Sequence, residues 1–227
     1  MSISSQLLIL NQTKKNIKQA INLKGVSVTN EAFSEYPDKV RQIPSGSGTY
    51  ESNVILFLEG RLRDLVVPSG TETIRDYAYT DSEMVTLTIP SSVRTIGKSA
   101  FCCNWSLTSV TIANGVTTIG DNAFATCTNL HELIFPDSVT AIGAYCGDYV
   151  PADIEIGTGI QSIGDSAFAN VWGKTICIKA TVPPTINNSF SEQDDIYVPD
   201  DSVLAYQTAT GWQKYSSRIK GISEKPQ

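Results

Sequence analysis

The heptapeptide "TIGDNAF" at residues 118–124 recurs almost unchanged as "TIGKSAF" at 95–101 and "SIGDSAF" at 162–168. Aligned on the isoleucine of this phrase, the chain shows five copies that start 21 to 23 residues apart. An apolar-x-apolar pair precedes each copy. A period of this length, kept in several columns at once, predicts a repeat architecture rather than a catalytic turn. The aligned isoleucines are Ile74, Ile96, Ile119, Ile142 and Ile163.

Each copy has the pattern of two short strands joined by turns. The apolar-x-apolar pair predicts a strand with alternate residues inward, and the proline that often follows ends it because proline cannot donate to a ladder. A second extended piece places Val116 and Ile119 inward. Gly120 then turns the chain, and Ala123 and Phe124 fill the core. One copy cannot bury its apolar face alone, so we expect the copies to stack into a mainly β solenoid.

The copies resemble a known family, the BspA-like bacterial leucine-rich repeats. The segments "LTSVTIANGVTTIGDNAFATC" (107–127) and "VTLTIPSSVRTIGKSAFCC" (85–103) match the family consensus nearly throughout. The resemblance covers about residues 54–200 and implies a right-handed leucine-rich repeat stack of about six rungs of 21–23 residues. One copy departs from the consensus, because Cys146 takes the alanine position and Gly147 the phenylalanine position. We expect that rung to be distorted, with a bulge before the next strand.

The C-terminal piece is expected to close the exposed end of the solenoid. The segment "IYVPDDSVLAYQTATGWQKYSSRIKGI" (196–222) contains a strand ending at Pro199, and Asp200 or Asp201 is the expected cap of a following helix. A solenoid needs such a piece because its terminal core is otherwise open to water. The aromatic residues expected to cover that core are Tyr206, Trp212 and Tyr215.

The first 52 residues differ in character from the repeat. Residues 1–44 have the pattern of a small helical module, and 45–52 that of a Gly/Ser-rich hinge. The solenoid with both caps then spans 53–222, and 223–227 form a tail. The helix–Gly–"VSV"–F-x-x-Y order of the first module resembles a module of bacteriophage tail and fibre proteins. That resemblance implies contacts with other virion proteins and, since fibres are commonly trimeric, a homotrimer.

Composition excludes several partners. The chain has 227 residues, is 41% hydrophobic and carries a formal net charge of −6. Residues 46–227 contain eleven Lys/Arg against twenty Asp/Glu, which is unfavourable for phosphate backbones. No run reaches the roughly 18 apolar residues of a membrane helix, and the start lacks the pattern of a secretory signal. We therefore expect no nucleic-acid partner, no membrane insertion, and synthesis in a bacterial cytoplasm.

The chain offers no recognisable catalytic or metal motif. It contains no GxSxG, HExxH, P-loop or GxGxxG pattern. His131 has no evident nucleophile partner, so a surface role is expected. The pairs Asp194–Asp195 and Asp200–Asp201 lack the ligand spacing of a calcium loop and suit solvated turns and a helix cap. Five cysteines without CxxC spacing suit reduced thiols packed as small hydrophobes. We expect no catalytic residue, cofactor or metal.

What remains is a surface made of the outward residues of each first strand. Such a flat, polar and regularly spaced face suits hydrogen bonding to a polymer or protein, although threonine favours any solvated strand. Loops and the cap are the alternative site. The first column is Asp64, Thr86, Ser109, Glu132, Asp153 and Thr175, and the second is Val66, Thr88, Thr111, Ile134, Glu155 and Cys177. All of these except Val66 and Cys177 are predicted binding residues.

Two tryptophans fall at rung edges, after the Ala-Phe corner. Trp105 and Trp172 are either lids on the core or exposed platforms for stacking on sugars. If they are platforms, they add aromatic contacts to the predicted face.

Three functions fit this sequence. The first is a non-enzymatic recognition module of a phage tail fibre or receptor-binding protein, located in the virion, that binds a host-surface protein or polysaccharide. The second is a cell-surface adhesin, the usual role implied by the BspA-like resemblance. The third is an intracellular repeat scaffold, which suits the free cysteines. The repeat reports geometry and does not name the ligand.

Overall fold

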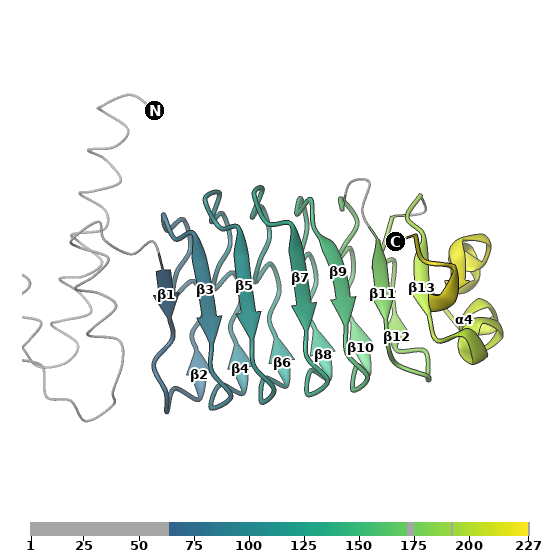
Figure 1. Ribbon diagram of the computed structural model, residues 1–227, viewed down its shortest axis with the longest axis horizontal. Helices are drawn as coiled ribbons and strands as arrows, with labels where there is room; N and C mark the ends of the chain where they lie inside the picture. Colours follow the sequence, from purple (N-terminus) through teal and green to yellow (C-terminus); the bar gives the residue numbers. More distant parts are fainter. Residues whose placement is uncertain (1–63, 172–174, 192, 227) are drawn as a thin grey trace, which may run out of the picture. The chain divides into compact units, whose positions relative to one another are not determined.

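The computed structural model describes residues 64–171, 175–191 and 193–226. These residues form a stack of parallel strands, with each turn of the chain lying on the one before it (Figure 1). The predicted N-terminal module, the hinge and most of the N-terminal cap (residues 1–63) lie outside the described residues, as does Trp172. The predicted mainly β solenoid is confirmed.

The first strand of each turn contributes to one side of the stack, here called the broad sheet. Its ladder joins three strands and, separately, five more within the described residues. In β3, β7 and β9 alternate apolar residues point inward and are buried, which is the period of two expected for half-buried strands, whereas β11 and β13 are buried throughout. The strands are β1 (Asp64–Val66), β3 (Thr86–Ile89), β5 (Ser109–Ile112), β7 (Glu132–Phe135), β9 (Asp153–Ile156), β11 (Ile176–Ile178), β13 (Ile196–Val198) and β14 (Ile219–Gly221).

The second strand of each turn contributes to the opposite side, the narrow sheet, where one ladder joins six strands in chain order. Each isoleucine of the repeat pairs with that of the next turn, as in Ile74 with Ile96 and Ile119 with Ile142. The predicted column is therefore confirmed as a buried column. The strands are β2 (Thr73–Ile74), β4 (Thr95–Ile96), β6 (Thr118–Ile119), β8 (Ala141–Ile142), β10 (Ser162–Ile163) and β12 (Thr185–Ile186).

The glycine after the isoleucine serves close packing between turns rather than the reversal that we expected. A Cβ atom at Gly120 would lie 2.6 Å from the backbone N of Lys98, and one at Gly143 would lie 2.4 Å from the backbone N of Asp121. Real Cβ atoms essentially never come this close to backbone. The repeated glycine thus lets one turn approach the next.

The reversal itself lies two residues later. Asn122 adopts φ 56°, a left-handed conformation that asparagine tolerates better than most residues. The backbone N–H of Phe101 donates to Ala123 O at 2.9 Å, so a ladder also follows this corner. Ala123 and Phe124 are fully buried as predicted. The same left-handed position is occupied in the other described copies by Tyr77, Ser99, Tyr145, Ser166 and Asn188.

The copy that departs from the consensus is not distorted, contrary to our expectation. Strands β7 and β9 pair over four residues, and the N–H of Gly147 donates to Ala167 O at 2.8 Å. The missing aromatic ring is compensated from the next turn, because a Cβ at Gly147 would lie 2.9 Å from Cδ1 of Phe168. The Phe168 ring also meets Phe135 edge-on, with ring centroids 5.8 Å apart.

The C-terminal end of the stack is closed as predicted. Tyr206, Trp212 and Tyr215 are fully buried. The Trp212 ring lies 5.5 Å from that of Phe190, the last aromatic residue of the repeat corner, and its Nε1 donates to Pro184 O at 2.9 Å. The cap contains η2 (Asp200–Ser202), α4 (Val203–Thr208), η3 (Gln213–Arg218) and η4 (Ile222–Glu224).

The predicted helix cap by Asp200 or Asp201 is wrong. Helix α4 begins at Val203 and has no side-chain cap bond. Asp200 Oδ1 instead accepts hydrogen bonds from the backbone N and the Oγ of Ser223, at 3.1 and 3.0 Å. This carboxylate therefore fastens the C-terminal tail to the end of the solenoid.

Candidate functional site

The broad sheet brings the two predicted columns together in register. Asp64 lies opposite Thr86 and Thr86 opposite Ser109, and on the second column Thr88 lies opposite Thr111. Beyond β7 the columns continue with Glu132 opposite Asp153 and Ile134 opposite Glu155. The outward surface of this sheet is called the broad face below.

Exposure divides the predicted residues into two groups. Those on β1 to β7 are exposed except for Thr86, which is half-buried, and those from β9 onward are all half-buried. The exposed members are Asp64, Thr88, Ser109, Thr111, Glu132 and Ile134, and the half-buried ones are Thr86, Asp153, Glu155 and Thr175.

Several of the acidic side chains on the broad face already have partners within the chain. Asp64 Oδ1 accepts from Thr86 Oγ1 at 2.7 Å, and Asp153 Oδ1 accepts from Thr175 Oγ1 at 2.9 Å. Glu155 forms an ion pair with Lys179, and this hydrogen bond raises the pKa of the lysine above its usual range. These groups fix the turns to one another and are less available to a ligand.

The centre of the broad face is different. Within the described ranges, the side chains of Thr88, Ser109, Thr111 and Glu132 make no hydrogen bond to another residue. They are the polar groups of the face that can bind a partner without first breaking an internal contact. Ile134 lies beside them with 39% of its surface exposed.

A discontinuity crosses this same region. The ladder of the broad sheet is interrupted between β5 and β7. The inward residues of β5, Val110 and Ile112, are half-buried, whereas Leu87 and Ile89 of β3 are almost fully buried. The repeat pattern gave no sign of this interruption, because Val110 and Ile112 fit the apolar columns as well as their counterparts do.

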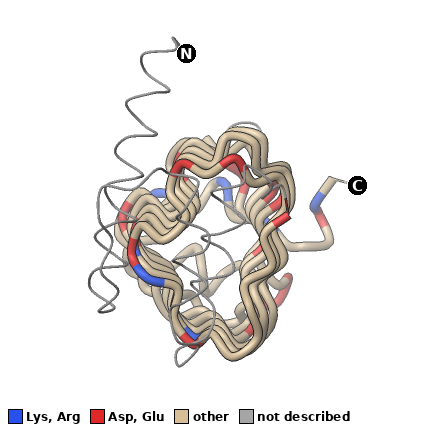
Figure 2. The backbone as a smooth tube through the Cα atoms, turned by 90° about the vertical axis from the view of Figure 1, so that its left-hand side faces the viewer, with Lys and Arg blue, Asp and Glu red and all other residues tan. Residues whose placement is uncertain are grey.

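The broad face ends before β11. Cys177 and Tyr197 occupy outward positions of β11 and β13, yet they are only 4% and 2% exposed. Figure 1 shows the C-terminus in front of these two strands, and Figure 2, viewed along the stack, shows the tail on the outside of the tube. Burial raises the pKa of the Cys177 thiol. Cys177 therefore takes its predicted outward position but is covered, which agrees with the expectation that the cysteines pack as small hydrophobes.

Aromatic residues are exposed at the rung edges. Trp105 is 44% exposed, so it is not a lid, and Asn129 Nδ2 donates to its backbone O at 2.6 Å. Three tyrosines that sequence reasoning missed, Tyr77, Tyr145 and Tyr149, are 42% to 58% exposed. For Tyr77 and Tyr145 the available signal was a bulky residue at a turn position that elsewhere holds serine or asparagine.

The described residues assemble no nucleophile with a base. His131 is exposed on the entry to β7. The cysteines in these ranges are free thiols, and burial raises the pKa of Cys127 to about 12. Cys102 and Cys103 are half-buried with their sulfurs 3.0 Å apart, and burial and the neighbouring thiol raise the pKa of Cys102 to about 12. Thiols held in this form are weak nucleophiles.

The described part of the chain holds no group of three or more His, Cys, Asp or Glu side chains that could bind a metal ion. None of its helices has both the length and the apolar character needed to cross a membrane.

The repeat, its parallel ladders and its stacked aromatic corner define a leucine-rich repeat solenoid. The chain belongs to the BspA-type leucine-rich repeat family, whose model matches six copies over residues 53–151 and 149–198. Proteins of this kind are typically non-enzymatic recognition modules.

Three solved structures are similar to this chain at low identity. A leucine-rich repeat protein of T. pallidum is 20% identical, with a TM-score of 0.46, over 70% of this chain and 86% of its own. One from Eubacterium ventriosum is 22% identical, with a TM-score of 0.48, over 65% of this chain and 38% of its own. The pneumococcal vaccine antigen PcpA is 14% identical, with a TM-score of 0.34, over 66% of this chain and 69% of its own. No curated protein matches the chain.

Proposed function

We propose that this chain is a non-enzymatic recognition module that binds a host-surface protein or polysaccharide through the broad face between β3 and β7. The observation that supports this proposal is the set of exposed, internally unbonded polar side chains on three successive strands. Thr88, Thr111 and Glu132 belong to it, together with Ser109.

The geometry suits an extended partner. Paired strands lie about 4.8 Å apart, so the hydroxyl groups on β3 and β5 repeat at that spacing, and Glu132 on β7 lies across the interruption of the ladder. Each of these side chains stands on a strand that is paired on at least one side, β3 with β5 and β7 with β9, which lowers the entropy cost of ordering it on binding. Ile134 adds a small apolar contact beside the polar columns, as recognition surfaces commonly do.

A second part of the proposal concerns where the protein acts, on a phage virion or on a bacterial cell surface. The resemblance of residues 1–44 to a module of phage tail and fibre proteins supports a virion protein, attached or trimerised through those residues. The repeat family supports the alternative, a bacterial cell-surface adhesin. In both the virion protein and the adhesin, the repeat domain would provide the binding surface.

The binding face is tested by replacing Thr88, Thr111 and Glu132 with alanine in the full chain and measuring the binding of the fluorescently labelled protein to bacterial cells. These cells are those of the bacterium that carries the gene, or of the host of its phage. Three lost hydrogen bonds at about 0.5–1.5 kcal/mol each predict at least a tenfold loss of affinity. The matched control replaces Glu72, Thr73 and Thr118, which are exposed residues of the same types on the narrow-sheet side. Loss of binding in the control, or retention in the first variant, would contradict the proposal.

Treatment of the cells separates the two kinds of ligand. Protease should abolish binding if the ligand is a protein, and periodate oxidation should abolish it if the ligand is a polysaccharide. Mass spectrometry of purified virions and of cell envelopes then shows whether the protein belongs to the virion or to the cell surface. A chain of residues 46–227 that keeps the full-length assembly state would refute the role of residues 1–44 in oligomerisation.

A further inference from the structure

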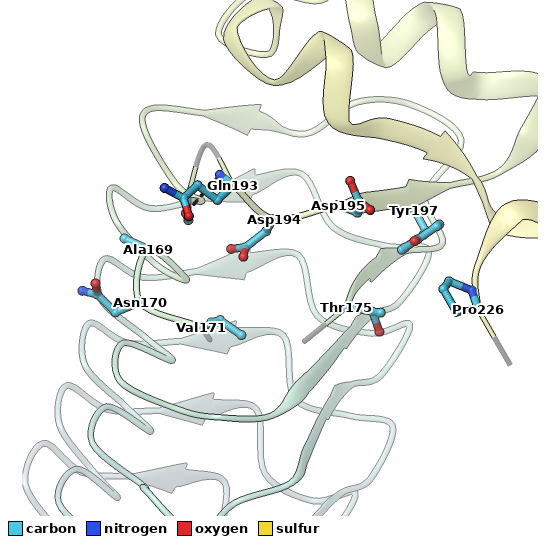
Figure 3. Close-up of a pocket in the computed structure, with 10 residues that line it drawn as sticks. Ala169, Asn170, Val171, Thr175, Gln193, Asp194, Asp195, Tyr197 and Pro226 are labelled. Atoms are coloured by element: carbon cyan, nitrogen blue, oxygen red, sulfur yellow. Dashed lines mark hydrogen bonds between the residues drawn. The ribbon is translucent and has the colours of Figure 1, made fainter. Parts of the chain in front are cut away.

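A cleft opens beside the starts of β11 and β13, at the end of the solenoid away from β1. Its volume is about 580 Å³, which is within the range of sites that hold small ligands or single side chains. Figure 3 shows the residues around it. Val171 and Pro226 give it apolar walls, while Asn170, Thr175 and Gln193 give it amide and hydroxyl groups.

One carboxylate in this cleft lacks a complete set of partners. Asp194 is only 8% exposed. Its backbone N–H donates to Ser191 O at 3.4 Å, but its Oδ2 is buried and has no hydrogen-bond partner among the described residues. In Figure 3 the carboxyl group points toward the space beside Ala169 and Asn170. A buried carboxylate in this state is costly unless it is protonated or meets a cation.

Two basic side chains of the described residues are paired with Asp195, the residue that follows Asp194. Asp195 accepts from Lys220 Nζ at 2.7 Å and forms a longer ion pair with Arg218 at 3.5 Å. Arg218 is the last residue of η3, and Lys220 lies in β14. Among the described residues, no basic side chain pairs directly with Asp194, and Arg218 offsets its charge only in part.

We propose that this cleft binds the cationic end of a lysine or arginine side chain of a protein partner, with Asp194 as the counterion. The apolar walls suit the methylene stem of such a side chain, and Asn170 and Gln193 offer amide oxygens to its remaining N–H groups. This site is separate from the broad face between β3 and β7, so the inference does not depend on the function proposed above.

The protonation of Asp194 makes this binding depend on pH. Burial raises the pKa of Asp194 to about 6; the Asp195 charge raises it further and Arg218 partly opposes the shift. Protons then compete with the cation, and at pH 5 about one tenth of the protein carries the ionised carboxylate. The apparent affinity should fall about tenfold between pH 7.5 and pH 5. Other charged groups of the described residues near the cleft are Asp195 with its partners Arg218 and Lys220, Asp148, which accepts from Asn170 Nδ2, and Lys225, which precedes Pro226.

The test is a calorimetric or NMR titration of the full chain with Nα-acetyl-lysine methylamide and Nα-acetyl-arginine methylamide. The uncharged norleucine analogue is the ligand control, and spermidine represents a free amine. Wild-type protein should bind at least one capped cationic residue and not norleucine. Asp194→Asn should weaken that binding at least tenfold and remove its pH dependence, while Asp201→Asn, at an exposed site in η2, should change neither.

Three results would overturn the inference. The first is that neither capped cationic residue binds to the wild-type protein. The second is that the Asp194→Asn variant binds them as tightly as wild type does, and the third is that only spermidine binds. The last result would make a free amine, and not a protein partner, the source of the cation. Folding is not a confounding factor, because asparagine has the shape of aspartate and removes a buried charge; circular dichroism of the variant checks this directly.

Discussion

A Cβ atom placed on Gly147 would lie 2.9 Å from Cδ1 of Phe168, so the ring of one turn occupies the space that a side chain of the previous turn would need. Gly147 stands where other copies have a buried phenylalanine, such as Phe124. The two residues therefore form one packing unit across two turns.

Gly147→Ala should destabilise the solenoid by about 1–3 kcal/mol, because the added methyl group overpacks the core. Phe168→Leu should also be destabilising, but the double variant should cost less than the sum of the two changes. Urea denaturation of the four proteins gives the coupling free energy. Simple additivity would show that the two sites do not share this space.

Gly120→Ala should cost about 2 kcal/mol or more, since its Cβ would lie 2.6 Å from the backbone N of Lys98 and neither turn can move without breaking ladder bonds. Asn114→Ala, at an exposed turn of the same copy, is the control and should stay within about 0.5 kcal/mol of wild type. Thermal or urea unfolding measures both. A stable Gly120→Ala protein would show that the approach of the turns is not limiting.

Removing residues 222–227 should expose Cys177, because the tail lies in front of β11. We expect the alkylation rate of Cys177 at pH 8 to rise at least tenfold, measured by peptide mass spectrometry in the native protein. Asp200→Ala, which releases Ser223, should give a smaller rise. Asp201→Ala should give none, and Cys127, buried inside the stack, should stay protected in every variant. An unchanged Cys177 would mean that residues other than the tail protect it.

Asp194 should make stability fall as pH rises. Its pKa is raised from 3.8 to about 6 in the folded protein, so the fold holds the proton more tightly than the unfolded chain does. The resulting stabilisation is complete below the unfolded pKa and is lost as pH rises through about 6. Asp194→Asn should therefore melt about 2–6 °C above wild type at pH 8 and gain less at pH 4.5. A gain that is equal at both pH values would contradict this assignment.

Much of the fold follows from the repeat alone. Ile119 recurs at a fixed interval, and Phe124 marks the same corner in most copies, so the stacking of turns and the buried columns could be predicted from spacing. The left-handed residue could not, because the position holds Tyr77 in one copy and Asn122 in another. The corner ladder between turns fixes this left-handed conformation, so it does not depend on a particular residue type at the position.

The exposure of residues on the broad face could be predicted from the sequence at the centre of the face but not at its C-terminal end. Thr88 and Thr111 are outward by strand alternation, and they are exposed. Cys177 obeys the same alternation but is covered by a tail some 45 residues later in the chain. The burial of Asp194 likewise depends on the packing of the cap. Contacts this distant in sequence leave no periodic signal.

The interruption of the broad sheet between β5 and β7 divides the stack energetically. In a repeat protein each turn is stabilised by its two neighbours, so the weakest junction decides which turns open together. At this junction the narrow sheet and the corner ladder persist while the broad-sheet ladder does not. The turns that contain β1, β3 and β5 should therefore open as one unit, ahead of those that the aromatic cap holds, and a ligand spanning the junction would join the two units into a single cooperative one.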